Sequence, residues 1–85
     1  MKSDEKKIKE LFKVLGLAIS QKRKKNKITL EQLGFDIGID KSGMHHIENG
    51  KPITLTTFFK ICAVLDVKPE VLIKDLPKLT KEDLD

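Results

Sequence analysis

The residues best suited to bind another molecule lie between positions 41 and 49. If this stretch is helical, Met44 and Ile47 share one side of the helix. The opposite side is polar and holds Ser42, His45, His46 and Asn49, with Lys41 at its margin. These side chains donate hydrogen bonds, none of them is acidic, and none is a large aliphatic. The face is therefore built to donate hydrogen bonds to a partner.

The two adjacent histidines also raise the question of a metal site. Consecutive helical residues point about 100° apart, so His45 and His46 are poorly placed to share one ion. No cysteine pair or nearby carboxylate completes a ligand set. The sequence has no glycine-rich phosphate loop, nucleophile–base pair or clustered carboxylate pair either. We therefore expect no metal, no cofactor and no enzymatic activity.

Two short helices joined by a tight turn should position the polar face. Thr29 is a suitable N-cap, and Gln32 three residues later completes the pattern of a capping box for the first helix. Leu33 and Ile37 lie four residues apart on one face of that helix. Gly38 has the place of the left-handed residue that follows a helix end.

The second helix of the pair begins after Asp40, whose carboxylate suits the positive end of a helix. Asn49 and Gly50 should end it. Two helices that cross steeply need a small residue at the crossing and a glycine in the turn, which Gly34 and Gly38 supply. The pattern predicts a helix–turn–helix over residues 30–50.

The stretch before this pair predicts one long helix over residues 5–25. Its apolar residues recur at helical spacing and are Ile8, Leu11, Phe12, Leu15 and Ile19. A basic cluster follows them and consists of Lys22, Arg23, Lys24, Lys25 and Lys27. These cations suit the negative end of the helix dipole, and they equally suit a ridge that contacts phosphates.

Two more helices should follow the pair. Thr54 is expected to cap one over residues 55–65, and a broad apolar face makes this the central buried helix. Phe58, Phe59 and Cys62 should all lie in the core on that face.

The last helix should begin at Pro69, a residue that suits the first turn, and should continue to Leu76. Pro77 then ends it.

Composition limits the choice of protein class. The chain has 85 residues, of which 39% are hydrophobic and 35% charged, as in one small globular domain. A net charge of +4 and a pI near 9.2 favour a polyanionic partner, nucleic acid first. The single cysteine excludes an internal disulfide. No apolar run is long enough for a membrane span or a signal peptide, so we expect no membrane partner and a cytoplasmic location.

Residues 15–76 resemble the Cro/CI-type DNA-binding proteins, also called lambda-repressor-like or XRE-family proteins. The most specific local match is the run from Ile47 to Lys51, with the sequence IENGK. The other matching positions are Leu15-Gly16, Ile19, Arg23, Thr29, Gln32-Leu33-Gly34, Gly38-Ile39, Met44 and the segment from Leu55 to Val67. The resemblance implies an all-α fold of five helices, in which residues 30–50 are the helix–turn–helix. The apolar spacing before residue 15 adds the expectation that the first helix is extended.

The resemblance also implies how double-stranded DNA is bound. The second helix of the pair would enter the major groove, which has the width to admit a helix. By this match, the base edges would be contacted by Lys41, Ser42, His45 and His46. Phosphate contacts are expected from Asn49, Lys51, Thr29, Lys24, Lys25 and Lys27.

An ion pair and a glycine lead to two further expectations. In the family, the arginine that matches Arg23 pairs with the glutamate that matches Glu48, so a structural ion pair should join the first helix to the recognition helix. Gly43 stands where family members usually carry a larger polar residue. A glycine there would allow close approach to another backbone or to a phosphate.

The chain is thus expected to divide into three parts. Residues 1–14 are a helical extension continuous with the first helix, residues 15–76 are the DNA-binding domain, and residues 77–85 are a polar tail. We expect sequence-specific binding to double-stranded DNA by a homodimer that regulates transcription as a repressor. The dimer surface should involve the fifth helix and tail, or the N-terminal extension.

Two alternatives stay open within this fold. The chain could be an antitoxin or a restriction–modification controller rather than a free-standing regulator. It could also be a protein-interaction module that has kept the fold and lost DNA binding.

Overall fold

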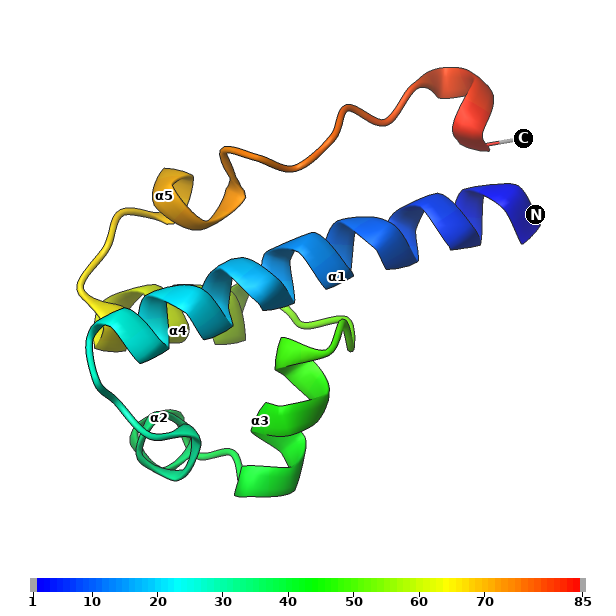
Figure 1. Cartoon of the computed structure of the whole chain (residues 1–85). Helices are drawn as coiled ribbons and strands as arrows, with labels where there is room; N and C mark the ends of the chain where they lie inside the picture. Colours follow the sequence, from blue (N-terminus) through cyan, green and yellow to red (C-terminus); the bar gives the residue numbers. More distant parts are fainter. Residues whose placement is uncertain (1, 85) are drawn as a thin grey trace.

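The computed structural model of the chain describes residues 2–84, with side chains described from residue 6 onward. Within this range the structure is all-helical and contains no strand, which confirms the predicted fold class. The elements are α1 (Lys2–Lys25), α2 (Leu30–Ile37), α3 (Lys41–Glu48), α4 (Leu55–Leu65), α5 (Pro69–Ile73) and a short 3-10 helix, η1 (Lys81–Leu84) (Figure 1). The predicted bounds of α2, α3 and α4 agree with these.

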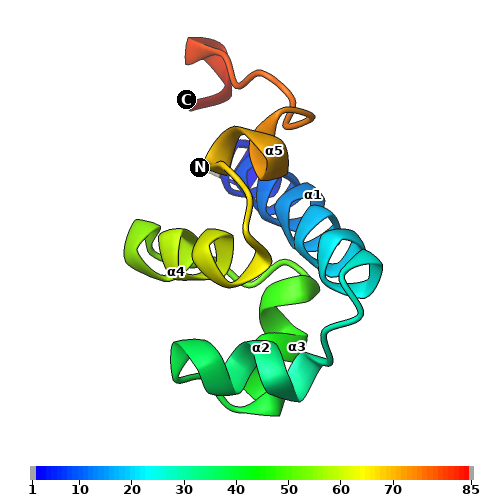
Figure 2. The same ribbon diagram turned by 90° about the vertical axis from the view of Figure 1, so that its left-hand side faces the viewer.

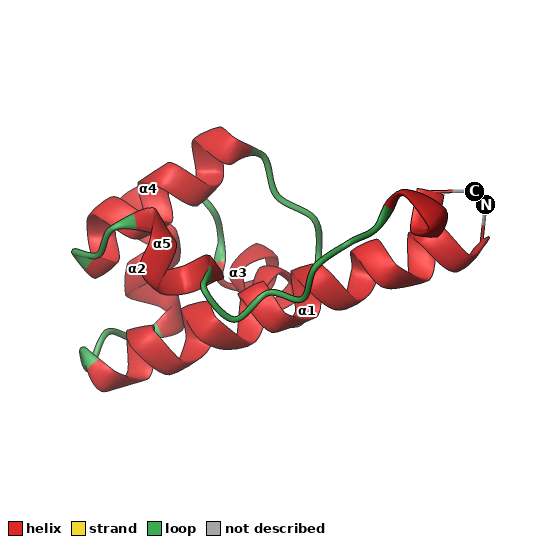
Figure 3. Cartoon of the chain, turned by 90° about the horizontal axis from the view of Figure 1, so that it is seen from above, coloured by secondary structure: helices red, strands yellow, loops and turns green. Residues whose placement is uncertain are grey.

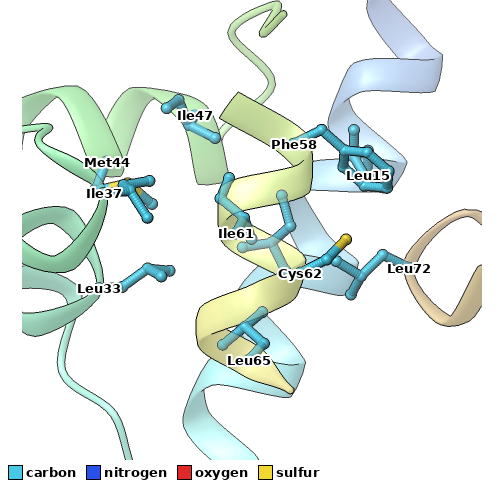
Figure 4. Packing of buried hydrophobic residues seen from close by; sticks show 11 residues of the cluster. Leu15, Leu33, Ile37, Met44, Ile47, Phe58, Ile61, Cys62, Leu65 and Leu72 are labelled. Atoms are coloured by element: carbon cyan, nitrogen blue, oxygen red, sulfur yellow. The ribbon is translucent and has the colours of Figure 1, made fainter. Parts of the chain in front are cut away.

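Helix α4 runs through the middle of the hydrophobic core. It packs against α2 on one side and against α1 and α5 on the other (Figure 4). The buried apolar residues are Leu15, Ile19, Leu33, Ile37, Met44, Ile47, Phe58, Ile61, Cys62, Leu65 and Leu72. Burial raises the pKa of the Cys62 thiol, so the cysteine is a protonated core residue, as predicted.

One part of the expectation for α4 is wrong. Phe58 is buried, but Phe59 is 53% exposed, and Leu55 at the start of the helix is 69% exposed. The apolar arc of α4 is wider than the surface that α1, α2 and α5 cover. Phe59 follows Phe58 directly, so the two rings point in different directions from the helix. An apolar strip of α4 is therefore left on the surface.

Helix α1 is longer than predicted, and its N-terminal end projects beyond α2, α3, α4 and α5 (Figure 1). The tail runs back along this projecting part, and η1 contacts α1 (Figure 3). Thr80 precedes η1, and its backbone N–H and its hydroxyl donate hydrogen bonds to Asp83 Oδ2 at 2.9 and 3.0 Å. These hydrogen bonds lower the pKa of the Asp83 carboxyl. Met1 and Asp85, the outer ends of the two predicted terminal segments, lie outside the described residues.

Helix α5 ends at Ile73, three residues before the predicted end at Leu76. Leu76 precedes Pro77, and a residue before proline is disfavoured in helical geometry. The chain instead makes a turn in which the backbone N–H of Leu76 donates to the Ile73 carbonyl at 3.1 Å. In the described range, no helix combines the length and apolar character needed to cross a membrane.

Candidate nucleic-acid interface

Helices α2 and α3 form the predicted helix–turn–helix, with α2 lying across α3 (Figure 2). Thr29 Oγ1 accepts a hydrogen bond from the backbone N–H of Gln32 at 3.0 Å and so caps α2. The reciprocal half of the capping box is not formed, because the Gln32 side chain donates to Asp36 one turn later, at 2.9 Å. Gly38 ends α2 with φ 82°, and Asp40 caps α3 by accepting from Gly43 N at 2.7 Å.

Two glycines allow the helices to approach α3 closely. A Cβ added to Gly34 would overlap the Ile39 carbonyl oxygen and come within 2.8 Å of Met44 Cγ. A Cβ added to Gly16 on α1 would lie 2.6 Å from the carbonyl oxygens of Ile47 and Glu48. Both glycines are therefore needed for the backbone of α3 to lie where it does.

An ion pair fixes the C-terminal end of α3 to α1. Arg23 Nε donates to Glu48 Oε2 at 2.6 Å, and Arg23 Nη2 donates to Glu48 Oε1 at 3.0 Å. The two side chains are only 10% and 8% exposed. Arg23 Nη1 also donates to the Ile28 carbonyl at 2.9 Å. This hydrogen bond holds the loop between α1 and α2 against α1. This is the pair that the family resemblance implied, in the bidentate geometry that strengthens such contacts.

The opposite side of α3 faces solvent. All five of the polar residues singled out from the sequence are exposed there, namely Lys41, Ser42, His45, His46 and Asn49. The rings of His45 and His46 meet edge to face, with centroids 5.9 Å apart. Asn49 Nδ2 donates to the His45 carbonyl at 2.8 Å and keeps a second amide hydrogen free. The structure thus brings these donors together on one face.

The residues expected to contact phosphates fall into two groups. Lys24, Lys25, Lys27 and Thr29 are exposed at the junction of α1 and α2, where Lys27 adopts a left-handed conformation with φ 59°. Lys51 is exposed just beyond the C-terminal end of α3, with Asn49, and its backbone N–H donates to the His46 carbonyl at 2.9 Å. The Thr29 hydroxyl accepts the cap hydrogen bond and can still donate its own hydrogen.

Gly43 does not lie on the outward face of α3. A Cβ added to it would lie 2.7 Å from Ile39 Cγ2 and 3.0 Å from Asp40 Oδ1. Within the chain, the close approach of this glycine is therefore to the side chains of Ile39 and Asp40 at the turn before α3.

One exposed residue was missed by the sequence analysis. Phe35 on α2 is 81% exposed and borders a shallow hollow at the turn into α3. The signal was present in the spacing, since Phe35 is two residues from both Leu33 and Ile37 and cannot share their buried face. Among the side chains of residues 6–84, no group of three or more His, Cys, Asp or Glu residues is arranged to hold a metal ion.

Comparisons with known proteins agree with this architecture. The sequence profile of a helix-turn-helix family matches residues 19–72. A high-resolution crystal structure of the restriction-modification controller protein C.AhdI from Aeromonas hydrophila superposes with a TM-score of 0.69. It is 27% identical in sequence, and the match covers 76% of this chain and 94% of that chain. No curated protein gives a significant match.

Proposed function

Since this chain belongs to the Cro/CI-type helix-turn-helix family of DNA-binding regulators, we propose that it binds double-stranded DNA sequence-specifically as a homodimer and represses transcription. The observation that carries the proposal is the division of α3 into two sides. One side is buried and held by the Arg23–Glu48 ion pair, and the other is an exposed row of hydrogen-bond donors. A rigid helix with a free donor face is what readout in the major groove requires.

We assign base contacts to Lys41, Ser42, His45 and His46 on that face. Lys41 suits guanine O6 and N7, and the histidines donate or accept according to their tautomer. Asn49 and Lys51 at the other end of α3 would hold a phosphate. The group at the α1–α2 junction, Lys24, Lys25, Lys27 and Thr29, would hold the backbone beside it.

Exposed apolar residues support the homodimer and suggest its surface. Leu55 and Phe59 lie one turn apart on α4, and Ile73 of α5 borders the same apolar hollow as Leu55. Apolar patches on the surface of a small protein mark association sites. The strip lies on α4 and the end of α5, whereas the sequence had favoured the fifth helix with the tail, or the N-terminal extension. In a homodimer joined at this strip, each copy would place its α3 in one half-site of the DNA. Dimeric helix–turn–helix proteins bind half-sites whose centres are about 34 Å apart.

Duplex binding at several salt concentrations tests the DNA-binding part. Affinity should fall steeply with salt, with a log–log slope of about 0.9 for each phosphate contacted. A folded protein that binds no duplex at any salt would favour the alternative, a protein-interaction module of the same fold.

Sedimentation tests the homodimer. Phe59→Glu should shift the protein from dimer to monomer, and Leu84→Glu, which alters an equally exposed apolar residue in the tail, should not. An unshifted Phe59→Glu dimer would exclude this surface.

The likeness to C.AhdI favours a second, narrower candidate, control of a restriction–modification system. This candidate shares the DNA-binding mechanism and differs in the genes that are regulated. The genes beside the coding sequence would decide between them, since a controller should lie next to a methyltransferase and an endonuclease.

A further inference from the structure

The N-terminal half of α1 carries three exposed lysines on one side, which we call the α1 ridge: Lys6, Lys9 and Lys13. They are three, four and seven residues apart, which are the spacings of neighbours on one face of a helix. Gly16 lies on the same face, three residues after Lys13. A Cβ added to Gly16 would lie 2.6 Å from the Ile47 carbonyl oxygen at the end of α3. The α1 ridge is therefore on the side of α1 that faces α3.

Lys13 joins the α1 ridge to the end of α3. A Cβ added to Gly50 would lie 2.7 Å from Lys13 Cγ and 3.4 Å from Lys13 Cα, so α1 lies directly against the chain that leaves α3. Lys13 also borders a hollow together with Glu48 and Asn49. The Glu48 carboxylate in this hollow is already paired with Arg23. Lys13 thus brings a cation to the end of α3, where the proposed function places a phosphate.

The fold does not account for these lysines. Cations stabilise a helix near its C-terminal end, whereas the α1 ridge lies in the N-terminal half of α1. Lys9 and Lys13 are like charges four residues apart, which weakens a helix. Glu10 at the margin of the ridge offsets only one of the three charges. The tail runs along the opposite side of α1 from α3, so it does not cover the ridge (Figure 1 and Figure 2). A negatively charged partner would make this arrangement favourable.

The position of the α1 ridge identifies that partner as the DNA bound by α3. The N-terminal end of α1 projects beyond the other α-helices, so the ridge continues past the end of α3 and not over the protein (Figure 1). From Lys6 to Lys13 the helix rises about 10 Å. Duplex DNA carries one charge for about every 1.7 Å of its axis, so several phosphates fit along that length. The family profile begins at residue 19, which leaves the ridge outside the matched part of the chain.

Resting on the DNA-binding function proposed above, we propose that the α1 ridge binds a further stretch of DNA backbone, beyond the phosphate held by Asn49 and Lys51. A lysine ammonium group attracts phosphates as a point charge and reads no base. The ridge therefore raises affinity for every duplex alike and lengthens the backbone that the protein contacts, while α3 sets the sequence. The N-terminal half of α1 is thus a second DNA-binding element of the same chain.

Replacing all three lysines of the α1 ridge in one chain tests the proposal. The variant carries Lys6→Gln, Lys9→Gln and Lys13→Gln. Glutamine keeps the Cγ atom that lies against Gly50 and favours a helix nearly as well as lysine, so the melting temperature should stay the same. The log–log salt slope for a selected operator should fall by about 0.9 for each lysine that contacts a phosphate. Affinity at near-physiological salt should fall at least about 10-fold, and the selected motif should stay the same.

A charge-matched control separates contact from net charge. Lys7→Gln, Lys78→Gln and Lys81→Gln together remove the same three charges from exposed positions. Lys7 points about 100° away from Lys6 around α1, and the other two lie in the tail. This control should keep the wild-type slope. Ethylation of single phosphates should also block binding of wild type and control at positions outside the selected motif, and these positions should no longer matter to the ridge variant.

Equal salt slopes for the ridge variant and the charge-matched control would overturn the α1 ridge as a DNA contact while leaving the DNA-binding function in place. A ridge variant that melts earlier and keeps the wild-type slope would overturn it as well, since the lysines would then serve the fold. A folded wild-type protein that binds no duplex would instead contradict the proposed function, and the ridge contact with it.

Discussion

The two sides of α3 differ in almost every physical respect. The inner side is buried, holds the bidentate Arg23–Glu48 pair, and lies against helices whose glycines bring the backbones close together. The outer side is exposed, and its side chains make few contacts within the chain. The inner side therefore determines where the helix lies, and the outer side is free to determine what it binds. Substitutions on the inner side should lower stability and all binding, whereas those on the outer side should change binding alone.

Breaking the Arg23–Glu48 pair should have the largest effect. In Glu48→Ala the Arg23 guanidinium keeps its charge in a buried site and retains only the Ile28 carbonyl as a partner. Loss of one member of a buried pair costs about 3 kcal/mol in the free energy of unfolding, which urea denaturation measures. His45→Ala, on the exposed side of the same helix, is the control and should unfold like wild type. If Glu48→Ala also unfolds like wild type, the pair does not hold α3.

Adding a methyl group at the helix crossing should come next. Gly34→Ala places a Cβ against the carbonyl oxygen of Ile39. This oxygen belongs to the backbone of the turn before α3, so it cannot move away unless α3 shifts as well. The expected loss of stability is about 1–3 kcal/mol, with weaker binding to every DNA sequence. Gly43→Ala is the comparison, because its Cβ meets side-chain atoms, Ile39 Cγ2 at 2.7 Å and Asp40 Oδ1 at 3.0 Å, and no backbone atom. Alanine also favours a helix by up to about 1 kcal/mol, so this variant should lose less stability than Gly34→Ala. Equal stability of the two variants would show that the close crossing is unimportant.

On the outer side, His46→Ala should change specificity without changing stability. One good contact to a base edge contributes about 1–3 kcal/mol of discrimination at one position of the site. The measurement is the affinity for each single-base variant of the selected operator, with melting temperature as the check on folding. If discrimination falls evenly over all positions, or not at all, His46 does not read a base.

Removing one phosphate contact should have the smallest effect. Lys51→Ala should weaken binding to all duplexes alike and lower the log–log salt slope by about 0.9. Lys78→Ala, an equally exposed lysine beyond α5, is the control and should leave the slope unchanged. A slope that stays the same in Lys51→Ala would place that lysine away from the DNA backbone.

Local patterns in the sequence predicted the helix–turn–helix well. The caps at Thr29, Gly38 and Asp40 depend on neighbouring residues, so their positions follow from the sequence and agree with the structure. The Arg23–Glu48 pair joins residues 25 positions apart, and spacing alone could not predict it. It was expected only because the sequence resembles a family with that pair.

The features that were missed depend on how much surface neighbouring helices cover. The apolar face of α4 was recognised, but the exposure of Phe59 reflects the limited reach of the helices around it. The contact between the tail and α1 depends likewise on the path of the chain after Pro77. The DNA contacts of the outer face stay predictions, since they depend on a partner as well as on the fold.

Selection from a random duplex library with purified protein, at near-physiological salt, tests the central claim most directly. The account predicts an enriched motif with two-fold symmetry, whose half-sites are centred about one helical turn apart. His46→Ala should select the same motif with one position in each half-site relaxed. A folded protein that enriches no sequence would contradict the claim that the outer face of α3 reads DNA.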